Sequence, residues 1–161
     1  MTTQTNERLE LSITRTFNAP ASAVWEIWSK REHMIRWWGP KNFETTHLDV
    51  DFRVGGAYRA CIYNDNFGGE NWMGGHFVEL VPNERIVMTF KWDKDNDSVG
   101  VETLITVTFS EHDGKTTQMF HQTPFLSPES RDSHIGGWTS LIDKEQAYVE
   151  CFAKGGPASE Q

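Results

Sequence analysis

The six histidines are the residues of this sequence best suited to proton transfer or ligand contact near neutral pH. No two of them stand four residues apart, and the chain has neither a His-Glu-x-x-His motif nor a Cys-x-x-Cys pair. Zinc sites use these spacings, so we expect no metal site. Three histidines remain as candidate polar contacts of a ligand. They are His76 and His121 in predicted strands and His134 in a predicted helix, one turn before Trp138.

Motifs for calcium binding, nucleophilic catalysis and nucleotide binding are incomplete or missing in this sequence. Residues Asp93 to Asp97 begin like a calcium loop, with a carboxylate at every second position. Ser98 stands where that loop requires Gly, however, and Leu104 stands where it requires the bidentate Glu. We therefore expect an acidic hairpin loop. The chain also lacks a Gly-x-Ser-x-Gly elbow and a Gly-x-Gly-x-x-Gly loop, so we expect no cofactor.

Aromatic side chains are the other candidates, since the chain has 7 Trp, 10 Phe and 3 Tyr. Rings at strand or helix spacing are first of all core residues. They become the walls of a cavity if a curved sheet holds a helix away from its centre. Pockets of this kind are mostly apolar with a few polar groups. The predicted ligand contacts are Trp28, Tyr58, Trp72, His76, Phe90, Phe120, His121, His134, Trp138 and Ile142.

Periodicity predicts the elements that position these residues. Polar and apolar residues alternate over 9–17, which is typical of a strand with one buried face. Helical spacing follows Pro20, with one helix over 21–30 and a second over 31–37, and Trp38-Gly39-Pro40 ends that run. Six further alternating runs, separated by Gly, Pro, Asn or Asp turns, indicate an antiparallel meander. They are 43–52, 57–63, 72–81, 85–92, 101–111 and 115–123.

The longest helix is predicted at the C-terminal end. Ser127 can serve as its N-cap and Pro128 as its first residue, and the helix runs to about Ala153. Its apolar stripe consists of Ile135, Trp138, Leu141, Ile142, Val149 and Phe152. The elements together predict an α+β domain, in which a curved sheet of six to seven strands covers its apolar face with this helix.

The strand over 85–92 supplies the clearest inward wall, since its apolar residues, Ile86, Met88, Phe90 and Trp92, all share one face. The strand over 72–81 is apolar on both faces, so its inward face stays undecided. Gly74-Gly75 in that strand is expected to mark a bulge that bends the sheet.

Composition narrows the partners and the location. The 161 residues carry a formal charge of −8 and no cluster of Lys and Arg, so we expect neither nucleic acid nor anionic membrane as a partner. No apolar run approaches the roughly 18 residues of a membrane span. The first ten residues lack the features of a secretory signal, which predicts a cytoplasmic protein. Cys61 and Cys151 are expected to be buried free thiols.

The order of several sequence motifs along the chain resembles that of a known family. This family is the activator of heat-shock-protein ATPase homologue-like (AHSA-like) proteins of the START-like SRPBCC superfamily. The resemblance covers about 9–152. The segments that carry it are Arg15 to Pro20 before Val24-Trp25, Trp37 to Pro40, Asp51 to Tyr58, Gly75 to Ile86, Thr103 to Phe109, and His134 with Gly137-Trp138.

The resemblance implies the helix-grip fold, with a hydrophobic cavity between the sheet and the C-terminal helix. We expect one such domain over 7–153, between disordered segments 1–6 and 154–161. Because this fold hosts many functions, the family alone selects no reaction.

Three functions follow as hypotheses. The first is a protein, monomer or homodimer, that binds a small hydrophobic or aromatic molecule. The second is an activator of a chaperone ATPase in the stress response, acting through its surface. The third is an enzyme of cyclase or dehydratase type that uses a cavity histidine as general base. Binding without catalysis is the expectation.

Overall fold

The computed structural model describes residues 9–93 and 101–155. The predicted N-terminal segment, residues 156–161 of the predicted tail and residues 94–98 of the predicted acidic loop lie outside this range. Within it, the elements follow in the predicted order, namely one strand, two helices, six strands and the long helix. No helix in the described part of the chain is long and apolar enough to cross a membrane.

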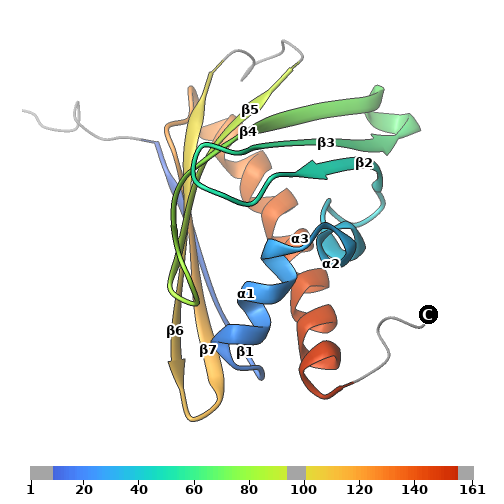
Figure 1. Ribbon diagram of the computed structural model, residues 1–161. Helices are drawn as coiled ribbons and strands as arrows, with labels where there is room; N and C mark the ends of the chain where they lie inside the picture. The colour runs from blue at the N-terminus through green and yellow to red at the C-terminus, as the bar shows by residue number, and fades with distance from the viewer. Residues whose placement is uncertain (1–8, 94–100, 156–161) are drawn as a thin grey trace, which may run out of the picture.

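Seven antiparallel strands form a single sheet in the order β1-β7-β6-β5-β4-β3-β2. The sheet is strongly curled, so that β2 to β4 run across the top of the helices while β6, β7 and β1 stand upright at their left (Figure 1). This is the predicted α+β helix-grip architecture. The strands are β1 Leu11–Phe17, β2 Glu44–Val50, β3 Ala57–Asn64, β4 Gly69–Val81, β5 Arg85–Trp92, β6 Thr103–His112 and β7 Lys115–Thr123.

The long helix α3, Pro128–Ala153, lies in the concave face of the sheet (Figure 1). It begins where the sequence predicts, because the Ser127 hydroxyl accepts a hydrogen bond from the Ser130 amide at 3.1 Å. The shorter helices α1, Ala21–Ser29, and α2, Arg31–Trp37, pack beside it. A 3₁₀ turn, η2, covers Asp65–Phe67.

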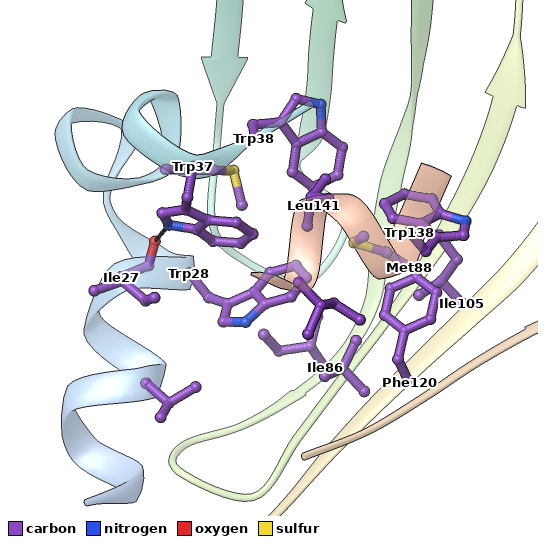
Figure 2. Packing of buried hydrophobic residues seen from close by; sticks show 14 of the residues in the cluster. Ile27, Trp28, Trp37, Trp38, Ile86, Met88, Ile105, Phe120, Trp138 and Leu141 are labelled. Carbon is purple, nitrogen blue, oxygen red and sulfur yellow. Dashed lines mark hydrogen bonds between the residues drawn. The ribbon is translucent and has the colours of Figure 1, made fainter. Parts of the chain in front are cut away.

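The core packs between the sheet and the three helices (Figure 2). Trp28 and Trp37 are essentially without exposure and meet edge to face, with ring centroids 4.9 Å apart. Each buried ring removes on the order of 150–250 Å² from water, so these indoles contribute much of the apolar burial. Ile86 and Phe120 close the core from the sheet side.

The bulge predicted at Gly74-Gly75 of β4 lies elsewhere in that strand. The β4–β5 register shifts between Phe77 and Glu79 rather than at Gly74-Gly75. The glycines instead let backbones approach, since a Cβ on Gly75 would lie 2.2 Å from the Thr89 carbonyl oxygen. At this point the Tyr58 hydroxyl donates to that same carbonyl.

Other details also differ from the sequence-based expectation. Strand β4 starts earlier than predicted, and its inward residues are Met73 and Phe77. Strand β2 ends at Val50, because the chain enters a tight turn in which the Gly56 amide donates to the Arg53 carbonyl at 2.8 Å.

The expectation for the thiols was half wrong. Cys61 is buried, but Cys151 is exposed near the end of α3, where the helix turns that face to solvent.

Candidate functional site

A pocket of about 580 Å³ opens between the first half of α3, the segment 38–43 that follows α2, and the inner face of β3 to β5. Volumes of this order accommodate drug-sized ligands. The lining residues are Trp38, Gly39, Pro40, Phe43, Ile62, Phe67, Asn71, Trp72, Met73, Phe90, Trp92, Glu129, Ser130, Ser133, His134, Gly137, Trp138 and Leu141.

A continuous row of rings forms one wall of this pocket. Trp38 meets Trp138 at 5.7 Å between centroids, Trp138 meets Phe90 at 5.5 Å, and Phe90 meets Trp92 at 5.4 Å. All three contacts are edge to face, which is a favourable geometry for aromatic pairs. The Trp138 indole is also fixed by a hydrogen bond of 2.7 Å to the buried Gln122 Oε1. The wall is therefore held in place by its own packing.

The segment 38–43, which carries Trp38 and Phe43 into the lining, is fastened to its neighbours. Lys144 on α3 donates from Nζ to the Gly39 carbonyl at 3.0 Å. Thr45 donates from Oγ1 to the Trp38 carbonyl at 2.7 Å. Gly39 itself has φ +95, a conformation that favours glycine, which explains why the turn needs this residue. These bonds position the Trp38 side of the pocket.

His134 is the histidine at the pocket, and both of its ring nitrogens are engaged. The Trp92 indole N–H donates to Nε2 at 3.0 Å, which makes Nε2 an acceptor. Nδ1 lies 2.8 Å from the Ser130 carbonyl and must therefore carry the proton. Burial lowers the pKa of His134, which agrees with this neutral tautomer. The ring anchors α3 to β5.

Comparison with known proteins identifies the family of this chain. A model of the "Activator of Hsp90 ATPase homolog 1-like protein" family matches residues 18–150. The chain belongs to this family. The match confirms the resemblance drawn from the sequence motifs. No protein among those with curated functions matches this AHSA1-like chain.

Solved structures with the same fold come from several bacteria. A protein of Chromobacterium violaceum is 25% identical with a TM-score of 0.76, over 88% of this chain and 97% of the other. An uncharacterized protein of Rhizobium leguminosarum is 26% identical with a TM-score of 0.76, over 89% and 95%. An AHSA1 protein of Silicibacter pomeroyi is 24% identical with a TM-score of 0.76, over 87% and 96%.

Four of the ten predicted contacts lie at the pocket of this AHSA1-like chain, namely Trp72, Phe90, His134 and Trp138. Trp72 needs a qualification, because its ring stacks on His47 at 5.0 Å and beneath Arg59. Strand alternation puts that ring on the opposite face from Met73, whose side chain is buried.

The other six predicted contacts lie away from the pocket lining. Trp28, Phe120 and Ile142 are core residues, and Tyr58 is buried opposite Gly75, where its hydroxyl donates to the Thr89 carbonyl. His76 is exposed on β4. His121 faces the outer side of the sheet, where its Nε2 lies 2.6 Å from Glu10 Oε1. Burial tendency could not separate core rings from pocket rings, since both kinds are inward.

Sequence reasoning also missed a buried carboxyl group, Glu145 on α3, which has no exposed surface. Its Oε2 accepts from the Trp28 indole at 2.9 Å, and its Oε1 accepts from Gln118 Nε2 at 2.9 Å. Burial raises the pKa of Glu145 to about 7, and the two hydrogen bonds oppose that rise. A signal existed, because Glu145 continues the helical spacing of Trp138, Leu141 and Ile142 on the apolar stripe.

Within the described ranges, no group of three His, Cys, Asp or Glu side chains is placed to hold a metal ion. The chemistry open to the pocket is therefore that of its rings and a few polar groups. Such a lining favours burial of an apolar or aromatic molecule.

Proposed function

We propose that this AHSA1-like domain binds a small apolar or aromatic molecule in the pocket between the sheet and α3. The observation that carries the proposal is the pocket itself. It has a volume of about 580 Å³, and the row of aromatic rings from Trp38 to Trp92 forms one of its walls. Burying apolar surface there gains roughly 25 cal/mol for each Å² removed from water. The rings are already ordered by their mutual contacts, so a ligand would lose little affinity to ordering them.

Two adjacent glycines of α3 offer a matched test. Gly137 lines the pocket, and a Cβ there would meet only the Pro40 side chain, at 3.9 Å. Gly136 is exposed, and a Cβ there would meet nothing within 4 Å. Both positions accept a side chain in the helix. Gly137→Leu fills part of the pocket, whereas Gly136→Leu does not.

The measurement is a fluorescence titration with N-phenylnaphthylamine, an uncharged aromatic probe. We expect the wild type and Gly136→Leu to bind it with similar affinity, and Gly137→Leu to bind it about tenfold more weakly, a difference of about 1.4 kcal/mol. Thermal unfolding of both variants checks that they fold. Equal affinity of the two variants would contradict the proposal, as would no binding to the wild type.

A second candidate function is activation of a chaperone ATPase through the protein surface, and the family description favours it. The test is the ATPase rate of a bacterial chaperone of the Hsp90 class with increasing amounts of this chain. A surface mechanism predicts equal stimulation by the wild type and Gly137→Leu. No stimulation at saturation would remove this candidate. The third hypothesis, a catalytic cavity histidine, gains no support from His76 and His121, which lie outside the pocket lining.

A further inference from the structure

The pocket lining has an acidic side chain but no basic side chain that is charged at neutral pH. Among the described residues of its lining, only Glu129 and His134 have ionisable side chains. Burial keeps His134 neutral, since it lowers the pKa of the ring, and the indole N–H of Trp92 donates to an unprotonated Nε2. Glu129 is exposed and takes part in no ion pair within the described chain. The described lining therefore carries a single negative charge at neutral pH.

Two cationic side chains near the pocket, those of Lys144 and Arg59, already have partners. Lys144 directs its ammonium group to the Gly39 carbonyl at 3.0 Å, behind the segment 38–43. Arg59 forms two bonds with the Asp93 carboxylate, the one from Nη1 measuring 2.7 Å. Neither side chain lines the pocket. A carboxylate ligand would find no free cation in the described lining.

The start of α3 does not offset this shortage. The Ser130 amide donates to the Ser127 hydroxyl at 3.1 Å, and the Arg131 amide donates to the Ser127 carbonyl at 3.1 Å. The Arg131 bond is the first regular bond of the helix, so the donors open to an anion belong to the first turn. There Pro128 has no amide hydrogen and the Ser130 amide is capped by Ser127, which reduces what an anionic ligand gains from the helix end.

We propose that the pocket prefers aromatic ligands that carry a protonated amine over aromatic carboxylates, with Glu129 as the counter-charge. This inference rests on the proposed function and names the ligand class for the same site. Aromatic rings attract cations to their faces, and the wall from Trp38 to Trp92 supplies several rings. Glu129 at the pocket adds a Coulombic attraction that salt should weaken.

The test uses three ligands with one skeleton, naphthylethylamine, naphthylethanol and naphthylacetate, measured by calorimetry at neutral pH. We expect the amine to bind about tenfold more tightly than the alcohol, and the acetate to bind more weakly than the alcohol. Glu129→Gln should weaken amine binding about fivefold and leave alcohol binding unchanged. The control is Asp132→Asn, since Asp132 is exposed on the same helix but outside the lining, and its ligand affinities should match the wild type.

The possible outcomes separate the two proposals. If the alcohol binds and Gly137→Leu blocks it, but the acetate binds as tightly as the amine, the charge preference is overturned and the pocket function stands. The same holds if Glu129→Gln leaves the ratio of amine to alcohol affinity unchanged. If none of the three ligands binds to the wild type, the pocket function falls, and the charge preference falls with it.

Discussion

At the scale of single residues, Glu145 is the most unusual group of the molecule. A carboxyl group without any exposed surface is costly to ionise, and its partners Trp28 and Gln118 are neutral donors. Its pKa, raised to about 7 in the folded state, compares with 4.5 as its ordinary value. Between these values the folded protein holds a proton that the unfolded chain has released. The stabilisation is thus full below pH 4.5 and is lost as the pH rises towards 7.

Replacing Glu145 by Gln should remove this pH dependence. In the wild type, the free energy of unfolding should fall by about 1.4 kcal/mol for each pH unit across that window, on the order of 3 kcal/mol in total. Glu145→Gln cannot ionise, so we expect it to be the more stable protein at alkaline pH. Urea unfolding across the pH range measures this difference. Glu44→Gln, at an exposed site on β2, is the control and should keep the wild-type slope. Parallel profiles for the wild type and Glu145→Gln would refute the expectation.

His134 shows the opposite linkage. Its folded pKa is lowered, so an unfolded chain takes up a proton near pH 6.5 that the folded protein refuses. Stability is therefore lost as the pH falls below that value. We expect the nitrogen spectrum of the ring to show the tautomer protonated at Nδ1 throughout the neutral range.

Burial lowers the pKa of His134, and the part played by the Trp92 side chain, which covers Nε2, can be tested by substitution. Trp92→Phe removes the indole donor to Nε2, so the pKa of His134 should rise towards its ordinary value in an NMR titration. Trp72→Phe is the control, because the Trp72 indole lies 3.4 Å from Glu70 and does not reach His134. A wild-type His134 that titrates near pH 6.5 would disprove the assignment.

At the scale of elements, the antiparallel neighbours β4 and β5 approach each other closely at Gly75 and Thr89. The register pairs Gly74 with Lys91 and Phe77 with Met88. Between those pairs the Thr89 hydroxyl accepts from the His76 amide at 2.9 Å. The missing side chain at Gly75 is what lets the strands come this close.

Gly75→Ala should therefore be strongly destabilising. Its Cβ would stand 2.2 Å from the Thr89 carbonyl oxygen, so the backbone of β4 or β5 must move. We expect a loss of about 2 kcal/mol or more in the free energy of unfolding, read from urea denaturation. Gly136→Ala is the matched control, since its position is open and helical. That variant should gain up to about 1 kcal/mol. A Gly75→Ala protein as stable as the wild type would show that the approach of the strands is not needed.

At the scale of the whole molecule, the curl of the sheet decides which rings are core and which are pocket wall. Near Trp28 and Ile86 the helices fill the concave face completely (Figure 2). Near Phe90 and Trp138 the first half of α3 and the segment 38–43 leave space. Aromatic residues thus form the packed core near Trp28 and the wall of an open pocket near Trp138. This division supports ligand binding as the proposal for the molecule.

The sequence by itself determined the elements and their order. Alternation in the strands, the Ser127-Pro128 start of α3 and the turn residues act within a few positions of one another, so they can be read locally. The inward face of β5 could be predicted for the same reason. The bulge predicted at Gly74-Gly75 was wrong, because the register shifts between Phe77 and Glu79.

Only the tertiary structure decided which side chains meet. The pocket joins Trp38, Phe90 and Trp138, which come from a loop, a strand and a helix far apart in the chain. Burial of Glu145 likewise depends on Trp28 from α1 and Gln118 from β7. Local patterns carry no information about such distances. The curvature of a sheet is set by contacts between strands. Of the ten residues predicted to contact a ligand, only four lie at the one pocket that this curved sheet forms with α3.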